Sequence, residues 1–279
     1  PIVRAVTEHG YTEPTPIQTQ AIPAVLSGGD LLAGAQTGTG KTAGFTLPIL
    51  HRLSATPAPQ AANGRSPVRA LILTPTRELA AQVEESVRVY GKYLPIKSMV
   101  MFGGVGMGPQ LSGLRNGIDI LVATPGRLLD HHQQGNLDLS KVEFFVLDEA
   151  DRMLDMGFHD SMIYVARQCP KDRQTMLFSA TYPDTIAKLS AQFLRQPKEV
   201  KVEATHEASK IRQRWYQVDR ETRLDAVTKL LLHYRPASTI AFCNTKQQCR
   251  DLVDVLTAHG IEAIALHGDL EQRDRDQVL

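Results

Sequence analysis

Residues 31–42 read LLAGAQTGTGKT, an apolar run that passes into a turn rich in glycine and threonine. From Ala35 to Thr42 the stretch fits the phosphate-loop pattern G-x-x-x-x-G-K-[ST], except that Ala35 stands at the first glycine position. Gly38 and Gly40 allow backbone N–H groups to curl around phosphate oxygens, and the helix that follows presents its positive amino end to them. We therefore expect a buried strand, a phosphate-binding loop and a helix, in that order.

This loop supplies the first set of candidate nucleotide-binding residues. In the pattern, Lys41 pairs with β- and γ-phosphate oxygens, and the Thr42 hydroxyl is a ligand to Mg²⁺. The alternative is an ordinary strand-to-helix turn, which rarely produces a pattern of this length by accident. The candidates are Ala35, Gln36, Thr37, Gly38, Thr39, Gly40, Lys41 and Thr42.

Apolar runs that end in a polar or glycine-rich turn recur along the chain. Stretches with helical periodicity, such as 78–90 and 111–116, lie between them. Buried strands that alternate with helices predict an α/β fold, with a parallel sheet and helices on both faces. Ligands bind at the carboxyl ends of strands in such sheets, where nearly every motif falls. The further runs are 70–73 before TPTREL, 98–102 before GGVG, 118–122 before ATPGR, 142–147 before DEAD and 175–178 before SAT.

The run at 142–147 ends in a group of acids, Asp148, Glu149 and Asp151. One carboxylate at such a strand end can hold Mg²⁺, and the next can orient an attacking water. The alternative is a set of acids that decorates a helix amino terminus, where the helix dipole favours them. The phosphate loop in the same chain favours the functional interpretation.

Composition sets limits on the class of protein. The chain has 279 residues and a net charge of +1, with 20 basic and 19 acidic residues up to residue 205 and 11 of each after it. Contact with a nucleic acid must therefore use local patches and backbone amides. No apolar run approaches the ~18 residues of a membrane span. Three cysteines form neither a disulfide framework nor a zinc pattern, which favours a reducing, cytoplasmic compartment.

The length predicts two domains. We expect the first at 1–203, a polar linker without periodicity at 204–211, and a second domain at 212–279. The chain begins at Pro1 and ends within an apparent helix, so we expect a fragment. In the second block we predict strands at 215–218, 239–242 and 263–266, and helices at 223–233 and 247–259.

DEAD at 148–151 follows AQTGTGKT, PTRELA (75–80), GG (103–104) and TPGR (124–127), and precedes SAT (179–181). This order resembles the DEAD-box ATP-dependent RNA helicases, over essentially the whole chain. Gly10-Tyr11 and PTPIQ at 14–18 resemble the adenine-recognising Q motif of that family. The resemblance implies a RecA-like domain followed by a truncated second RecA-like domain, with ATP and Mg²⁺ as cofactors and RNA as partner.

For the nucleotide, the resemblance implies that Gln18 bonds the adenine edge. It implies that Tyr11 lines the base site, although a core aromatic is an equal alternative. Lys41, Asp148 and Glu149 become the catalytic residues, and Thr42 and Asp148 the metal ligands. Coupling of the nucleotide to domain closure is implied for Asp151, Ser179 and Thr181.

For RNA, the resemblance implies contacts to backbone phosphates and 2′-hydroxyls that carry little sequence information. For Arg77, a surface salt bridge with Glu78 or Glu84 is the alternative. The implied RNA contacts are Pro75, Thr76, Arg77, Gly103, Gly104, Thr124, Pro125, Gly126 and Arg127, with Gln272 and Arg275 from the second block.

Two finer expectations follow from the resemblance. Residues 35–50 and 69–83 resemble the RhlE-type bacterial helicases, whereas 242–252 and 267–277 are more similar to the DbpA-type ribosome-assembly helicases. Ribosome-assembly or RNA-decay proteins are therefore candidate partners. Without the last second-domain motifs of the family, we expect weak ATP binding and very slow hydrolysis. A nucleotide-gated RNA clamp and a DNA-unwinding phosphate-loop ATPase are the alternative functions.

Overall fold

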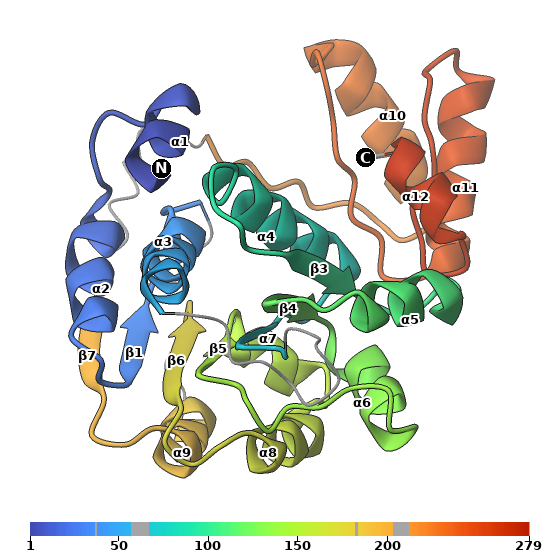
Figure 1. The fold of residues 1–279 in the computed structure, drawn as a ribbon. Coiled ribbons are helices and arrows are strands. Elements are labelled where there is room, and N and C mark those ends of the chain that lie inside the picture. The colour runs from blue at the N-terminus through green and yellow to red at the C-terminus, as the bar shows by residue number, and fades with distance from the viewer. Residues whose placement is uncertain (37, 57–66, 182–183, 203–211, 279) are drawn as a thin grey trace. The chain divides into compact units, whose positions relative to one another are not determined.

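The computed structural model describes residues 1–36, 38–56, 67–181, 184–202 and 212–278, except the side chain of Asp276. The chain divides into two units, Pro1–Thr205 and His206–Leu279, and each is described here by itself. Figure 1 shows the elements of both units along the chain.

The first unit is built on a seven-stranded sheet in which every pair of neighbours is parallel. The strand order is β3-β4-β2-β5-β6-β1-β7, which confirms the predicted α/β class. The strands are β1 Leu31–Gly34, β2 Ala70–Leu73, β3 Ser98–Met101, β4 Ile120–Ala123, β5 Phe144–Leu147, β6 Gln174–Ser179 and β7 Lys198–Lys201.

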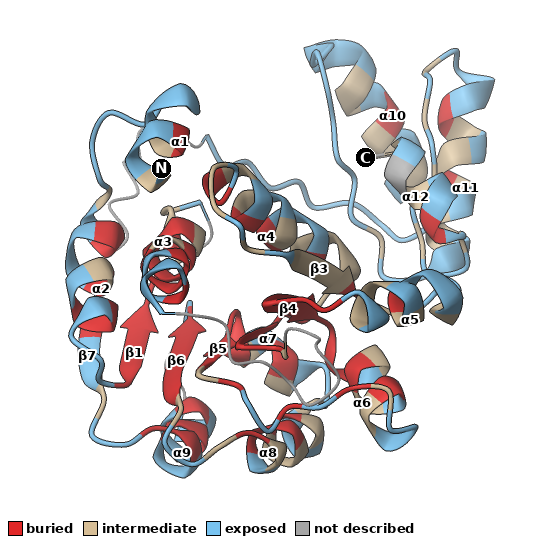
Figure 2. Cartoon of the chain, viewed as in Figure 1, coloured by how far each residue is buried: buried red, intermediate tan, exposed pale blue. Residues whose placement is uncertain are grey.

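Six of these strands fall on the predicted apolar runs, with ends that differ by at most two residues. Five of them, β1, β2, β4, β5 and β6, are buried at every position, as expected for strands covered on both faces (Figure 2). The seventh strand, β7, was not predicted. It reads KEVK and buries only Val200, because it is the edge strand beside β1 and exposes its charged residues.

Helices cover both faces of this sheet, as predicted. Successive residues of a strand point to opposite faces, so Leu31 and Ala33 join one core cluster and Leu32 joins the other. The first cluster packs on α2 Pro16–Leu26, α3 Lys41–Ala55 and α4 Arg77–Tyr90, with α1 Ile2–Glu8 at its edge. The second packs on α5 Met107–Arg115, α6 Pro125–Gln133, α7 Ala150–Asp155, α8 His159–Gln168 and α9 Asp184–Phe193.

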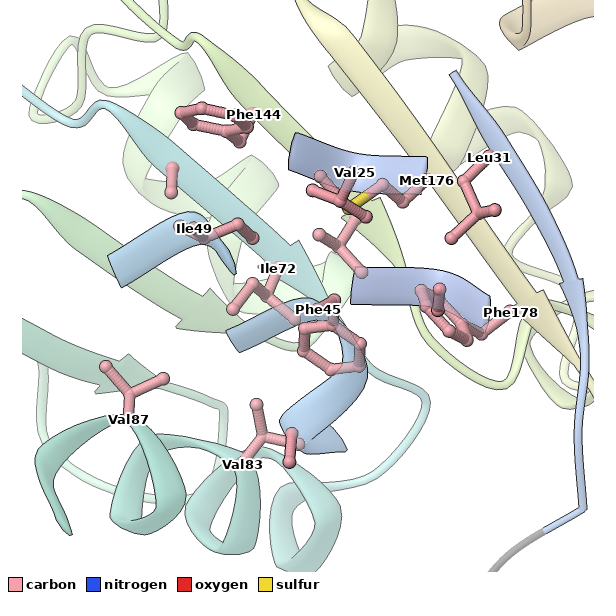
Figure 3. Packing of buried hydrophobic residues seen from close by; sticks show 14 of the residues in the cluster. Val25, Leu31, Phe45, Ile49, Ile72, Val83, Val87, Phe144, Met176 and Phe178 are labelled. Carbon is pink, nitrogen blue, oxygen red and sulfur yellow. The ribbon is translucent and has the colours of Figure 1, made fainter. Parts of the chain in front are cut away.

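The first core cluster positions the phosphate loop, because α3 packs its apolar face directly on the central strands. Figure 3 shows Phe45 and Ile49 of α3 beside Ile72 and Phe178 of the sheet. The rings of Phe45 and Phe178 lie 5.0 Å apart. Burial of these side chains fixes α3, which begins directly after the loop, against the sheet.

The described second unit consists of α10 Arg223–Tyr234, α11 Lys246–Ala258 and α12 Gln272–Val278. The first two confirm the predicted helices to within one residue. The strands predicted at 215–218, 239–242 and 263–266 are wrong, since none of these segments forms a ladder among the described residues. Trp215, Ile240 and Phe242 are 83%, 81% and 94% exposed. Apolar alternation marks a segment that could pair, but a strand exists only when a neighbour accepts its hydrogen bonds.

Candidate functional site

The phosphate loop lies between the end of β1 and the start of α3. Gly38 and Gly40 have φ of +81° and +85°, a left-handed conformation that glycine adopts at little cost. The Thr39 hydroxyl donates to the Gln36 carbonyl oxygen at 2.7 Å. Thr37, the remaining residue predicted in this loop, lies outside the described residues. These turns bring the chain back over the strand end before α3 begins.

Ala35 is bonded to the sheet and is not part of the phosphate-binding turn. Its backbone N–H donates to the Ser179 carbonyl oxygen at 3.1 Å, and the residue is 2% exposed. The alanine methyl group therefore takes part in the core at the position where the pattern has glycine. Its N–H is already used, so phosphate contact falls to the residues after it.

The amino terminus of α3 is suited to an anion. The helix begins with Gly40 as its N-cap and has no side-chain cap and no acidic residue in its first turn. The first N–H groups of a helix have no partner inside the helix, and the helix dipole makes this end positive. The predicted Mg²⁺ ligand Thr42 is half-buried in this turn.

Lys41 connects the loop to the acids at the end of β5. Its Nζ lies 3.1 Å from Asp148 Oδ1 and 3.5 Å from Glu149 Oε1. All three residues are buried, at 4%, 0% and 7% exposure. The backbone N–H of Asp148 donates to the Leu73 carbonyl oxygen at 2.9 Å, which anchors the acid at the end of the neighbouring strand β2.

The carboxyl group of Asp148 is buried, so its charged form is costly. Burial raises the pKa of its carboxyl group, and the Lys41 ammonium partly opposes that shift. Apart from the ion pair, neither carboxylate oxygen has a hydrogen-bond partner among the described residues. Two buried oxygens of this kind fit a hard cation such as Mg²⁺, which is held by one or two carboxylates together with substrate phosphates and water. Asp148 and Thr42 would hold the ion, and it would neutralise phosphate charge.

Glu149 adopts an unusual backbone conformation. Its φ of +52° and ψ of +51° are left-handed, which is uncommon for a residue with a side chain. Strain of this kind gathers at functional sites. Its second carboxylate oxygen lies 3.7 Å from Arg152 Nη1, in the first turn of the helix that Glu149 precedes. The conformation turns the carboxylate toward Lys41.

The predicted coupling residues form one hydrogen-bonded group at the ends of β5 and β6. Asp151 Oδ2 accepts from the Thr181 backbone N–H at 3.1 Å and from the Thr181 hydroxyl at 2.9 Å. The Ser179 hydroxyl donates to the Thr181 carbonyl oxygen at 2.6 Å. The sequence SAT is thus bound directly to DEAD, which spacing alone does not show.

Gln18 contacts the phosphate loop. Its amide Nε2 donates to the Gly40 carbonyl oxygen at 3.1 Å, and its Oε1 accepts from the Thr15 backbone N–H at 3.0 Å. Thr15 is the N-cap of α2, and the bond from its backbone N–H to Gln18 is one half of the capping box that the spacing T-x-x-Q indicates in the sequence. The amide thereby holds together the predicted adenine segment and the predicted phosphate segment.

Tyr11 is not a core aromatic, because 43% of its surface is exposed. Its ring lies beside those of His9 and Tyr90, at 5.3 Å and 6.3 Å between centroids. The Tyr90 hydroxyl lies 3.4 Å from the Tyr11 hydroxyl. Its role at the base stays a prediction.

The three segments predicted to contact RNA come together at the ends of β2, β3 and β4. Thr76 caps α4 by accepting from the Leu79 backbone N–H at 3.3 Å. Thr124 donates its backbone N–H to the Met101 carbonyl oxygen at 3.0 Å, so TPGR adjoins the strand that leads to Gly103 and Gly104. Pro125 and Gly126 open α6, and Pro75 lies in the turn before α4.

The guanidinium of Arg77 lies against Gly104. A Cβ atom placed on Gly104 would be 2.1 Å from Arg77 Nη1, so a side chain there would displace the arginine. Glu84, one of the alternative partners, accepts from the Ser98 hydroxyl at 2.8 Å. Arg127 donates from Nη1 to the Val105 carbonyl oxygen at 2.9 Å. Both arginines therefore contact the loop from Gly103 to Gly106, called the glycine loop below.

Gln272 and Arg275 lie on α12 in the second unit. Gln272 is buried at 8% exposure, and Arg275 is half-buried. The spacing Q-x-x-R places them one turn apart on a helix. Their predicted RNA contact is untested by this geometry.

The geometry adds residues to the predicted site that the sequence reasoning did not find. Thr15 holds Gln18, Arg152 faces Glu149, and Gln110 and His131 lie beneath the glycine loop. Only the capping box of Thr15 has a recognisable local signature. The others act through contacts between elements that are distant in sequence.

Residues 15–189 match the family model described as DEAD/DEAH box helicase. The chain belongs to the DEAD/DEAH box helicase family. Residues 222–279 of this family member match the model of the helicase conserved C-terminal domain.

Named relatives and a solved structure agree with this family. The chain is 43% identical to the ATP-dependent RNA helicase DbpA of Escherichia coli over 98% of its own length and 58% of the relative. It is also 43% identical to the ATP-dependent RNA helicase DeaD of Mycobacterium tuberculosis, over 100% of its own length and 48% of the relative. A crystal structure of a DEAD box protein from Methanococcus jannaschii has a TM-score of 0.67 and 35% identity, covering 99% of this chain and 73% of that one.

This member of the DEAD/DEAH box family therefore spans about half the length of the curated relatives it matches. The match to DbpA runs through both predicted blocks, and the resemblance of the first block to RhlE-type helicases stays a prediction. In the described part of the chain, no helix is both long and apolar enough to cross a membrane.

Proposed function

We propose that this chain is part of an ATP-dependent RNA helicase that opens short duplexes locally, with ATP binding and hydrolysis coupled to RNA binding. The observation that carries the proposal is the buried group of Lys41, Asp148 and Glu149, in a chain of the DEAD/DEAH box helicase family. Phosphoryl transfer requires a cation on the phosphates, a metal ligand and a residue that orients water, and these three side chains offer those functions.

In the proposed reaction, Lys41 moves its charge from the two carboxylates to the β- and γ-phosphate oxygens. Asp148 and Thr42 would hold Mg²⁺, and the bound ion would neutralise phosphate charge. Glu149 accepts a proton from the attacking water or orients it toward the γ-phosphate. Gln18 and Tyr11 recognise adenine, and the amide of Gln18 provides both a donor and an acceptor for the base edge.

Asp151, Ser179 and Thr181 are proposed to transmit the nucleotide state. Their support is the pair of hydrogen bonds from Thr181 to Asp151, next to the acid that faces Lys41. The division into an ATP-binding domain at 1–203, a linker at 204–211 and a partial second domain at 212–279 belongs to the same proposal. The two units and the two family matches support it.

RNA is proposed to bind through its backbone at the loops after β2, β3 and β4, with Gln272 and Arg275 contributing from the second unit. Arginines, threonine hydroxyls and helix amino ends are suited to phosphate and 2′-hydroxyl groups rather than to base edges. The net charge of +1 agrees with a narrow track of contacts. We place the activity in the cytoplasm, with ribosome-assembly or RNA-decay proteins as candidate partners.

The test is ATP turnover with and without RNA, for this chain beside a version extended to the length of its relatives. We expect RNA, and not DNA of the same sequence, to stimulate the extended protein, because the 2′-hydroxyl distinguishes the two. We expect this chain alone to turn over slowly. Tighter RNA binding with ATP but no turnover in either protein would instead indicate a nucleotide-gated clamp. Equal stimulation by DNA would indicate a DNA-unwinding ATPase.

A further inference from the structure

A buried polar cluster lies beneath the glycine loop that follows β3. It consists of Gln110 on α5 and of Arg127 and His131 on α6, one turn apart. Gln110 Oε1 lies 3.1 Å from Arg127 Nη1 and 2.9 Å from His131 Nε2. Gln110 is 7% exposed and His131 is fully buried. None of the sequence motifs includes Gln110 or His131.

The hydrogen bonds fix the orientation of each group. Gln110 Nε2 donates to the Phe102 carbonyl oxygen at 2.9 Å, so the amide nitrogen points toward the strand that leads into the loop. Its Oε1 must then accept from both neighbours, because an arginine can only donate. His131 consequently carries its proton on Nε2 and donates it to Gln110.

His131 is held in its neutral form. Burial lowers the pKa of its imidazole, and the positive charge of Arg127 lowers it further, against the opposing effect of Asp130. Its Nδ1 has no hydrogen-bond partner among the described residues. A neutral ring with a single proton on Nε2 accounts for both observations, since Nδ1 then has only a lone pair.

The cluster connects two segments of the proposed RNA site. Arg127 donates from Nη1 to Gln110 and also to the Val105 carbonyl oxygen at 2.9 Å, so one guanidinium joins α6 to the glycine loop. Gln110 joins the same arginine to the Phe102 carbonyl oxygen, at the other end of that loop. The loop from Gly103 to Gly106 is thus bonded at Phe102 by the Gln110 amide and at Val105 by the Arg127 guanidinium, and Gln110 links the two contacts.

We propose that Gln110, oriented by the Nε2–H of His131, is a positioning residue that sets the glycine loop and Arg127 in the arrangement that receives the RNA backbone. This inference rests on the proposed function, because it assigns the loop to RNA. The oxygen and the nitrogen of a buried amide both form hydrogen bonds only when their partners have the right distance and angle. The cluster therefore fixes the orientation of these side chains, which apolar packing would not do. Phosphate binding depends on such preorganised donors.

The experiment measures the affinity of the 279-residue chain for fluorescein-labelled oligo(U) RNA by anisotropy, with ATP and Mg²⁺ present. ATP affinity is measured separately on the same proteins. Gln110→Met keeps the length of the side chain and removes the amide. We expect RNA affinity to fall about tenfold, the effect of losing one to two hydrogen bonds, while ATP affinity changes by less than about twofold.

His131 is tested by a pair of variants. In His131→Gln an amide N–H replaces the donor at Nε2, and we expect RNA affinity near the wild-type value. In His131→Phe the ring remains without a donor, and we expect a loss of about threefold. The double variant with Gln110→Met should bind no more weakly than Gln110→Met alone, since both act through one amide.

His132→Phe is the matched control, because His132 lies next to His131 on α6 and contacts Tyr164 instead of Gln110. Affinities are measured well below the lowest unfolding midpoint, so that all proteins are folded. If the wild type binds RNA and every variant binds it equally, the inference is wrong and the proposed function stands. If neither the wild-type chain nor the version extended to the length of its relatives binds RNA, the proposed function fails and the inference with it.

Discussion

The ammonium of Lys41 lies 3.1 Å from a carboxylate oxygen of Asp148 that is fully buried. One group comes from the phosphate loop and the other from the end of β5. Phosphate and Mg²⁺ would each attract one member of this pair, since Lys41 prefers an anion and Asp148 a cation. The ion pair therefore keeps two buried charges compensated until nucleotide offers both of them new partners.

Replacing Asp148 by asparagine should stabilise the chain in the absence of nucleotide. Burial raises the pKa of this carboxyl group despite Lys41, so the ionised form destabilises the fold at neutral pH. Lys41 keeps Glu149 as a partner in the variant. We expect the unfolding midpoint measured by calorimetry to be higher for Asp148→Asn than for the wild type.

The stability difference between wild type and Asp148→Asn should depend on pH. Between the ordinary aspartate pKa and the raised value, the folded state binds more protons than the unfolded state, so wild-type stability falls as pH rises. The difference between wild type and Asp148→Asn should therefore be small below the ordinary value and grow above it. Asp155→Asn, at an exposed position on α7, is the control and should show no such growth. A constant difference at all pH values would contradict this assignment.

Replacing Glu149 by glutamine should abolish turnover while ATP still binds. The amide keeps the size of the side chain but cannot accept a proton from water. We expect kcat to fall about 10²- to 10⁴-fold in the extended protein, with ATP affinity changed by less than about threefold. Arg152→Gln removes the charge that lies 3.7 Å from Glu149 and should have a small effect. Unchanged turnover in Glu149→Gln would remove Glu149 from the reaction.

Alanine at Gly40 should destabilise the chain more than alanine at Gly38. Both glycines have a left-handed φ, which costs an alanine ~1–2 kcal/mol. A Cβ on Gly40 would lie 2.6 Å from Gln18 Nε2 and 3.0 Å from the Thr15 hydroxyl, whereas one on Gly38 would have no atom of the described residues within 4 Å. Denaturant unfolding without nucleotide should show a further loss of about 1–2 kcal/mol for Gly40→Ala, because the Gln18 hydrogen bonds are displaced. Equal losses would indicate that Gln18 moves aside freely.

Alanine at Gly104 should weaken RNA binding through Arg77. The added Cβ would meet the Arg77 guanidinium at 2.1 Å, whereas a Cβ on Gly103 meets no atom within 4 Å in the part of the chain that the structure describes. Because Arg77 is a flexible side chain, the clash moves the arginine, and the left-handed φ of +83° at Gly104 adds the ~1–2 kcal/mol of strain that an alanine meets in that conformation. In anisotropy titrations with oligo(U) we expect about a tenfold loss for Gly104→Ala and less than about twofold for Gly103→Ala. Similar affinities would show that RNA does not use Arg77.

Much of this arrangement could be predicted from local patterns. The six predicted strands and the helices at 78–90, 223–233 and 247–259 are present because continuous apolar runs and helical periodicity mark which residues become buried. The edge strand β7 escaped prediction because three of its four residues are charged or exposed. The three strands predicted in the second unit were wrong because an apolar alternation does not itself provide a paired neighbour.

The functional site was also predicted only in part, because local motifs do not show which residues contact one another. The residue types at the strand ends could be chosen from the motifs, but their partners could not. Gln18 was expected at adenine, and its amide also bonds the Gly40 carbonyl oxygen. Arg127 was expected as an RNA contact, and its guanidinium also donates to the Val105 carbonyl oxygen and to Gln110 Oε1. Such contacts depend on side-chain geometry between elements that sequence separates.

By itself, the sequence determined the order of strands and motifs along the chain, and with it the chemical groups that reach the carboxyl edge of the sheet. Only the tertiary structure decided which of those groups meet. Lys41 contacts Glu149 across 108 residues because β1, β6 and β5 are neighbours in the sheet. The physical reason is that backbone hydrogen bonds between strands are the same for every pair. Strand order is therefore set by how the buried side chains and helices pack together, which no single stretch of sequence contains.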